Sequence, residues 1–536
     1  IKIILFFFFL AAGSATVLAN NLRLSNLDVF ATNDSAHTMT FSLDLGQANS
    51  WRTPASHDAA WIFMKYSTDA GATWHHASMA GSGITPSGFS AAQDFEIVVP
   101  PDQKGFFFRR ADVGSGDADT KGIRFVWNYA QDGLSDDVAK AANTLTRVYG
   151  LEMVYVPEGA FFAGDGASSS EFRFKQGSAD DSPWYIASES AITTTNTATA
   201  GFYYQGSGSP GENISGDVFL LPNSFPKGYR AFYLMKYELT EGEWVSFFNT
   251  LSSAAKSQRD VTSFKNSDGI VNRNTVSWDA SNANFPAKTD RPARPMTCLS
   301  WPDAAAFAAW AGLRPMTELE FEKAARGVDI QPVADEFAWG STSYSAAGAE
   351  EIFPPNQDED GTETVLSGTA NLSRNALGWT SGDGRTGGPA QGQKGPLRAG
   401  IFATNSSSRV TSGAGYYGNM ELSGNLAEPA VTLGRSQGRQ FLGTHGTGEL
   451  TILSGHEGNA ANVDWPGIDL QDSHRGVTGT VGIGYRGGDY QSASLRSFQT
   501  SSRSFAVRDP DSEGWSQRYD LASGIVWGGR FARTAP

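Results

Sequence analysis

The sequence predicts an α+β protein in two parts: an N-terminal β-sandwich of immunoglobulin or fibronectin type over residues 20–149, and a loop-rich domain over residues 150–536. Two observations lead to this prediction. Up to about Gly150, short runs of β-branched and aromatic residues alternate with clusters of Gly, Pro, Asp and Ser, a pattern typical of strands and turns. After Leu151, a few short helix signals stand in a chain rich in Gly and aromatic residues.

Length and charge narrow the class of protein. A chain of 536 residues is too long for one ordinary core, so we expect two or more domains. The formal net charge is −15. This charge argues against a nucleic-acid partner, because phosphate binding needs clustered Lys and Arg. It suits a soluble exported protein, or one that uses carboxylates to bind divalent cations.

Residues 1–19 are predicted to be a secretory signal peptide. Lys2 precedes the apolar run 3–10, and Val17-Leu18-Ala19 resembles a cleavage site. The run is too short to span a membrane comfortably, and no second long apolar segment follows, so we expect no membrane span after signal removal. We expect a secreted, cell-surface or periplasmic protein. With one cysteine, Cys298, the chain forms no internal disulfide, and we expect this side chain to be a small buried hydrophobe.

The N-terminal part contains five strand candidates, at residues 29–30, 38–45, 60–66, 95–99 and 123–129. No catalytic constellation is visible among them. His75 and His76 are adjacent, and adjacent residues on a strand point to opposite faces, so they make a poor metal chelate. A module of this kind usually serves as a spacer or an adhesion unit.

Three helices are predicted from capping boxes, in which a Ser or Thr oxygen accepts from a first-turn amide and an acidic side chain reaches back. The boxes are Thr240–Glu243, Ser300–Asp303 and Thr317–Glu320. Apolar residues follow each box at helical spacing, and Gly327 marks the expected end of the third helix.

The third helix, in R-P-M-T-E-L-E-F-E-K-A-A-R-G at residues 314–327, resembles the signature helix of the formylglycine-generating-enzyme, or sulfatase-modifying-factor, superfamily. Further matches follow the family's order, at residues 152–164, 231–240, 294–312, 417–428, 485–490 and 527–533. The resemblance implies a compact, loop-rich variant of the C-type lectin fold for residues 150–536. The polar stretch near residues 168–216 is predicted to be an insertion of surface loops.

The chain departs from the family at the residues that carry its best-known chemistry. The family's oxidase uses two cysteines, five residues apart, that bind copper and activate oxygen. Aligned on Gly487-Gly488, these positions are Ser492 and Ser497. A serine hydroxyl is a hard oxygen donor and cannot replace a soft thiolate for Cu(I). We therefore expect no catalytic residues of this kind and no copper. The histidines also lack the H-x-x-x-H-x-E spacing of the family's iron-dependent branch.

The resemblance also implies calcium sites. The first would use Glu421 and Glu428 with the carbonyls of Gly424 and Leu426, because Ca²⁺ is bound by oxygen ligands. The alternative is that both carboxylates only accept hydrogen bonds from backbone amides in a Gly-rich turn. A looser second match comprises Asn371, Leu372, Asp383 and Arg385.

Aromatic and Arg residues mixed with small polar ones near the C-terminus predict a ligand-binding surface. The candidates are Tyr490, Arg496, Phe498, Trp515 and Tyr519. The alternative is that these side chains pack inside the domain. The sequence thus predicts a secreted or cell-surface, non-catalytic binding or structural protein whose partner is an extracellular protein, a glycan or another copy of itself. The alternative function is a metal-dependent oxidoreductase of the same superfamily with an unrecognised active site.

Overall fold

The computed structural model describes residues 21–80, 95–167, 169–206, 214–264, 269–278, 286–344, 395–404, 406–490, 492, 494–506 and 527–536. It is about 13% helical and 31% strand, which agrees with the predicted α+β class. The predicted signal peptide lies outside the described residues. Within them, we find no helix that combines the length and the hydrophobicity needed to cross a bilayer.

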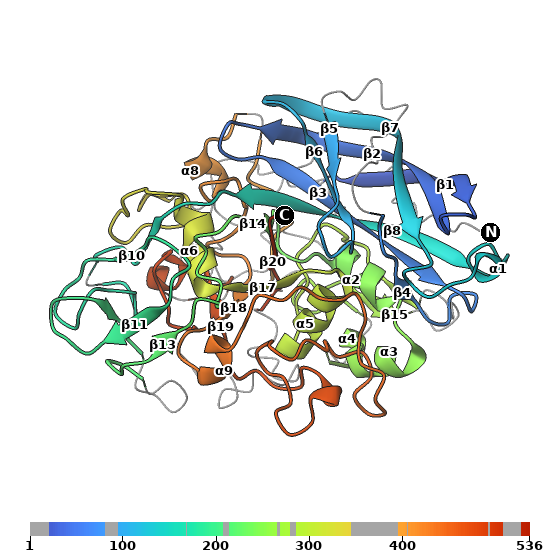
Figure 1. The fold of residues 1–536 in the computed structure, drawn as a ribbon. Helices are drawn as coiled ribbons and strands as arrows, with labels where there is room; N and C mark the ends of the chain where they lie inside the picture. Colours follow the sequence, from blue (N-terminus) through green and yellow to red (C-terminus); the bar gives the residue numbers. More distant parts are fainter. Residues whose placement is uncertain are drawn as a thin grey trace.

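The N-terminal layer is an antiparallel sheet of three strands in the order β1-β2-β7 (Figure 1). These strands span Arg23–Asn33, Thr38–Arg52 and Gly114–Asn128. Phe41 and Phe125 face each other in the β2–β7 register, with their rings stacked at 5.5 Å between centroids. The short helix α1 (Asp136–Ala139) follows this sheet.

A second, much longer sheet runs through the molecule in the order β19-β18-β17-β20-β14-β8-β3-β6-β5, with β4 paired to β3. In chain order its strands are β3 (Asp58–Ser67), β4 (His75–His76), β5 (Phe95–Val98), β6 (Phe106–Arg110), β8 (Leu145–Val156), β14 (Phe232–Met235), β17 (Arg314–Thr317), β18 (Glu428–Val431), β19 (Ile483–Arg486) and β20 (Phe531–Thr534). Each of the five predicted strand candidates falls within a strand or overlaps one.

An independent immunoglobulin- or fibronectin-type sandwich is not confirmed. The three-stranded sheet does share a core with β3 and β6, which contains Phe41, Ile62 and Phe106. However, β3 also pairs with β8, and β8 pairs on its other side with β14. Strand β8 runs across residues 149–150, the predicted boundary, so one continuous sheet connects the two parts of the chain.

The three predicted capping boxes are confirmed. Thr240, Ser300 and Thr317 cap α2 (Glu241–Phe248), α5 (Trp301–Trp310) and α6 (Glu318–Arg326), each with the reciprocal acidic side chain in place. Cys298 precedes α5 and is buried, as predicted.

The polar stretch near residues 168–216 contributes to the core as well as to the surface. It forms β10 (Trp184–Ile186), β11 (Ile192–Thr195) and β12 (Phe202–Tyr203), which pair with β9 (Phe161–Ala163), with β13 (Leu220–Leu221) and with one another. Three of its aromatic residues, Phe174, Trp184 and Tyr204, are fully buried, whereas Tyr185 is exposed. The segment therefore does not consist of surface loops alone, because a few buried aromatic side chains pack it against the core.

The remaining elements are short. They are α3 (Ser253–Arg259), α4 (Val261–Phe264), β15 (Ser277–Trp278), β16 (Ala287–Lys288), α8 (Arg409–Ser412), α9 (Ser436–Arg439), η2 (Ser473–Arg475) and η3 (Leu495–Phe498). Figure 1 shows that α6 lies beside the β17–β18–β19 end of the long sheet, away from the N-terminal layer.

Candidate functional site

The predicted calcium residues lie in a strained turn that leads into β18. Glu421, Gly424 and Asn425 all have positive φ angles, of 57°, 97° and 63°. Glycine adopts this conformation freely and asparagine tolerates it, but glutamate rarely does. Such strain persists only where the surrounding structure enforces it, and it is concentrated at functional sites.

This turn is held by two other loops, and we call the three segments, residues 395–402, 420–428 and 487–490, the loop junction. The Gly424 amide donates to the Gly487 carbonyl at 2.8 Å, and the Tyr490 amide donates to the Asn425 carbonyl at 2.9 Å. The Leu397 amide donates to Oδ1 of Asn425 at 2.8 Å. These three hydrogen bonds connect the turn to both of the other loops.

Three buried carboxylates meet at the junction. Glu428 accepts from Nε of Arg530 at 2.7 Å, and Glu421 accepts from the Gly400 amide at 2.7 Å. Glu238 accepts from the Leu426 amide at 2.8 Å and also from the Asn425 side chain.

In two of these carboxylates, one oxygen makes no hydrogen bond to the described residues. Oε2 of Glu421 and Oε2 of Glu428 are buried, and neither has a hydrogen-bond partner within the part of the chain that the structure describes. Buried polar atoms are usually satisfied, so these two oxygens are candidates for contact with a proton, a water molecule or a cation.

The pKa values of the three carboxyl groups are all raised by burial at the junction. Burial raises the pKa of Glu421 to about 7 and that of Glu428 to about 7, against the opposing effect of Arg530. Burial also raises the pKa of Glu238 well above its usual range, and the negative charges of Glu428 and Glu421 raise it further. A single buried cation that faced all three groups would favour their ionised forms.

The side chains alone do not make a complete metal site. Across the described ranges, no three His, Cys, Asp or Glu side chains are grouped so that they could hold a metal ion. The predicted calcium site contains only two carboxylates and needs the carbonyls of Gly424 and Leu426 as well. The unsatisfied oxygens of Glu421 and Glu428 fit a hard cation, while the Arg530 contact to Glu428 competes with one. The second predicted site, at Asn371, Leu372, Asp383 and Arg385, lies outside the described residues.

The two positions aligned with the oxidase cysteines lie just beyond the junction. The hydroxyl of Ser492 donates to Oδ2 of Asp489 at 3.0 Å and accepts from the Asp489 amide at 3.1 Å. Ser497 lies in η3, and its amide donates to the Ser494 carbonyl at 3.1 Å. Both serines therefore take part in ordinary turn hydrogen bonding.

The predicted ligand-binding surface needs correction at two residues. Tyr490 is 1% exposed and belongs to the main core, and Phe498 is 0% exposed and packs with Phe337 and Trp339. The local sequence is polar, which suggested a surface, but tertiary packing draws both rings inward. Arg496 is exposed, as predicted. Trp515 and Tyr519 lie outside the described residues.

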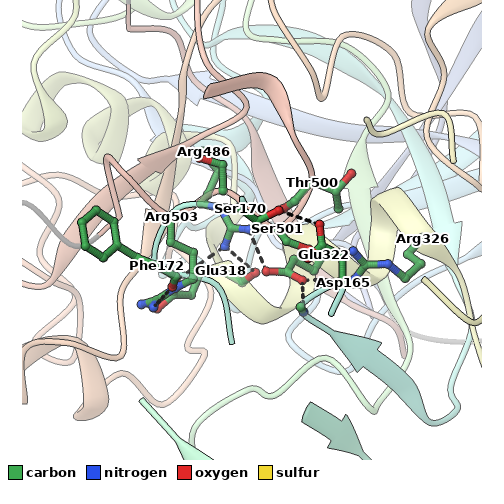
Figure 2. A network of polar contacts seen from close by, with 12 residues as sticks. Asp165, Ser170, Phe172, Glu318, Glu322, Arg326, Arg486, Thr500, Ser501 and Arg503 are labelled. Atoms are coloured by element: carbon green, nitrogen blue, oxygen red, sulfur yellow. Dashed lines mark hydrogen bonds and ion pairs between the residues drawn. The ribbon is translucent and has the colours of Figure 1, made fainter. Parts of the chain in front are cut away.

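A buried ionic network on α6 holds the segment that follows β19 (Figure 2). Arg486, at the end of β19, donates to Oε1 of Glu322 at 2.8 Å. Arg503 donates from Nε to Oε2 of Glu318 at 2.7 Å. Arg326 donates to Oε2 of Glu322 at 3.1 Å. These side chains are at most 1% exposed, so the network acts as a scaffold that fixes both ends of the segment 487–502.

Sequence reasoning missed Glu238 and Arg530 at the junction. Glu238 and Lys236 are the two charged residues in an otherwise apolar run that leads into α2, and the carboxylate in this run was the available signal. Arg530 lies within residues 527–533, which matched a family motif as a whole, but the motif alone did not show that its arginine faces Glu428.

Comparison with known proteins finds a family match for part of the chain. Residues 186–384 match the model of the sulfatase-modifying factor enzyme 1-like domain. This range contains α2, α5 and α6 with their capping boxes. The predicted first calcium site and the two serines lie beyond its C-terminal end.

Two curated relatives match part of the chain. The formylglycine-generating enzyme of Thermomonospora curvata is 50% identical over 64 residues, which is 12% of this chain and 20% of that protein. The formylglycine-generating enzyme of Bos taurus is 26% identical over 191 residues, which is 28% of this chain and 48% of that protein. The chain thus spans less than half the length of the curated relatives that it matches.

Proposed function

The chain contains a domain of the formylglycine-generating-enzyme, or sulfatase-modifying-factor, superfamily, and from this premise we propose that it is a non-catalytic member with a binding or structural role. The observation that carries the proposal is the pair Ser492 and Ser497 at the positions where the family's oxidase has cysteines. Cys298 is the chain's one cysteine, and it lies in the core before α5. Thiolate–copper chemistry would need two accessible sulfur ligands.

The environment of Ser492 supports this reading. Its hydroxyl both donates to and accepts from Asp489, so it closes a turn. The segment 487–502 is also anchored at both ends, through Arg486 and Arg503 on α6. A loop anchored at both ends is a suitable platform for recognition whether or not it carries chemistry.

We propose Ca²⁺ as a structural cofactor at the loop junction. Glu421 and Glu428 would supply carboxylate oxygens, and Gly424 and Leu426 would supply carbonyls. Bound calcium would satisfy the two buried oxygens and stabilise the strained turn. The exported location and the extracellular protein, glycan or self-assembly partner rest on the signal-like residues 1–19 and the acidic charge.

The proposal that the protein is non-catalytic is tested by measuring oxygen consumption with a cysteine-containing sulfatase peptide, with and without added copper. We expect no turnover above background for the purified protein, and metal analysis should find calcium without copper or iron. Turnover, or stoichiometric copper or iron, would instead support the metal-dependent oxidoreductase.

A gain-of-ligand variant makes the same test sharper. If Ser492 and Ser497 occupy the family's copper positions, the double variant Ser492→Cys/Ser497→Cys should bind Cu(I) tightly. Each single variant is the matched control, because one thiolate gives a much weaker copper site. A double variant that binds copper no better than the single variants would contradict the alignment of these two serines.

A further inference from the structure

An apolar cavity of about 370 Å³ lies away from the loop junction, where the N-terminal layer meets the helices. Residues that flank or belong to β1, β8, α2, β16 and α5 line it. Figure 1 shows β8 between the N-terminal strands and the helices α2 and α5. The volume lies within the range of pockets that hold small organic ligands, and pockets often form at such boundaries between structural units.

The walls of the cavity are largely apolar and incompletely covered. Leu22, Leu24, Val148, Tyr149 and Val245 all line it, and each side chain is only half buried. Side chains of this type gain stability when they are removed from water. The walls therefore favour a ligand with an apolar body.

The charged groups on the lining favour an anionic end on that ligand. Lys288 is exposed and lines the cavity together with Arg147, whose guanidinium lies 4.2 Å from the ring centre of Trp74. The acidic residue of the lining, Glu243, is already engaged, because its carboxylate accepts from the Thr240 amide at 2.8 Å in the α2 capping box. The positive charge of the exposed Lys288 is therefore the one that would attract the anionic end.

A tryptophan ring forms part of the wall of the cavity on the α5 side. Trp310 is 4% exposed and lines the cavity from α5. Its indole N–H is buried and has no acceptor in the described part of the chain. The indole therefore contributes to the apolar wall, and no role in ligand binding is assigned to its N–H group.

We propose that this cavity binds a medium-chain fatty-acid-like amphiphile, with its alkyl chain among the leucine and valine side chains and its carboxylate near Lys288. The site is separate from the loop junction and from the segment 487–502. It does not depend on whether the protein is catalytic.

The direct test is calorimetric titration of the full chain with octanoate, decanoate and dodecanoate below their critical micelle concentrations. We expect saturable one-to-one binding that tightens about fourfold for each added methylene until the cavity is full. Absence of saturable binding for all three chain lengths would overturn the proposal.

Two matched substitutions locate the binding. The hydroxyls of Ser246 on α2 and Ser257 on α3 both donate to the carbonyl four residues earlier, but only Ser246 lines the cavity. Ser246→Trp should fill the cavity and reduce dodecanoate affinity at least tenfold, while Ser257→Trp should bind as the unchanged protein does. Equal affinities in the two variants would overturn the location. If circular dichroism shows that Ser246→Trp does not fold, Val245→Phe serves the same purpose.

A third variant tests the anionic end. Lys288→Gln should weaken dodecanoate binding several-fold and leave binding of the neutral dodecanol unchanged. If the unchanged protein binds dodecanol as tightly as dodecanoate, or if Lys288→Gln affects neither ligand, the assignment of a carboxylate end is wrong.

Discussion

Arg530 donates from Nε to Oε1 of Glu428 at 2.7 Å, and neither side chain has any exposed surface. The same guanidinium donates to the carbonyls of Met235 and Lys236, at the end of β14. One arginine therefore connects the strained turn before β18 to the centre of the long sheet. It also supplies positive charge to a junction where Glu238, Glu421 and Glu428 are all buried.

Replacing this arginine should be strongly destabilising. Arg530→Met would leave buried carboxylates without their cation, and breaking a buried pair in this way typically costs about 3–5 kcal/mol. The free energy of unfolding in urea, measured at pH 7 with EDTA, checks this. Lys121→Met is the control, because Lys121 and Asp119 pair at 2.9 Å while both are largely exposed. A similar small change in both variants would show that the junction tolerates its own negative charge.

Calcium at the junction predicts a specific response to chelation. A cation bound only by the folded state stabilises it by about 2.7 kcal/mol at a hundredfold excess over Kd. Calcium should raise the melting temperature of the unchanged protein, EDTA should reverse this effect, and Glu428→Ala should abolish the response.

The matched control for this experiment is Glu320→Ala. Glu320 is also buried and pairs with an arginine, Arg314, at 2.6 Å, but it lies on α6 and is not part of the loop junction. This variant should be destabilised and yet keep its response to calcium. If Glu428→Ala retains the full response to calcium, the first calcium site is wrongly assigned.

A histidine outside the loop junction is predicted to make the stability of the protein sensitive to acid. His57 contacts the Tyr233 hydroxyl at 2.9 Å, and burial lowers its pKa to about 3, with Arg109 and Arg52 contributing. Between pH 6.5 and about 3 the unfolded chain binds a proton at this position that the folded protein does not. The stabilising effect of neutral His57 is therefore complete above pH 6.5 and is lost as the pH falls.

The variant His57→Gln isolates this effect, because glutamine keeps a hydrogen-bonding group and does not titrate. Between pH 7.5 and 4.5 the unchanged protein should lose on the order of 2 kcal/mol more stability than His57→Gln does. Urea unfolding at the two pH values gives the comparison. Parallel losses in the two proteins would mean that His57 is protonated without penalty in the folded state.

The sequence predicted local structure better than it predicted assembly. The capping boxes at Thr240, Ser300 and Thr317 were readable because each depends on two residues three positions apart. The continuous sheet through β8 was not readable, because its partners on β3 and β14 lie about 80 residues to either side. No local pattern reports which distant strands a given strand pairs with.

In the candidate site, too, residues within one local motif were predicted and residues brought there by the fold were not. Glu421 and Glu428 were found because they flank a Gly-Asn turn in one motif, whereas Glu238 and Arg530 join the junction only through the fold. Tyr490 and Phe498 were assigned to a surface because their neighbours are polar, and tertiary packing places both rings in the core. The polar composition of a short segment therefore does not show whether its aromatic side chains are buried or exposed.

The anchoring of the segment 487–502 should depend on the shape of the Arg503 side chain as well as on its charge. Its guanidinium contacts Glu318 through Nε at 2.7 Å and through Nη2 at 3.2 Å, and it donates to the carbonyls of Phe172 and Gln205. It also lies over the rings of Phe174 and Tyr204. Lysine keeps the charge but has neither the planar fork nor enough donors for these partners. Arg503→Lys should therefore lower the free energy of unfolding by about 2 kcal/mol or more, because buried acceptors are left unsatisfied.

Arg496→Lys, an exposed change in the same segment, should have little effect. Urea unfolding measures both variants, and hydrogen exchange should show faster exchange of the 487–502 amides in Arg503→Lys alone. Unchanged stability and exchange in that variant would mean that Arg486 is sufficient to hold the segment on α6.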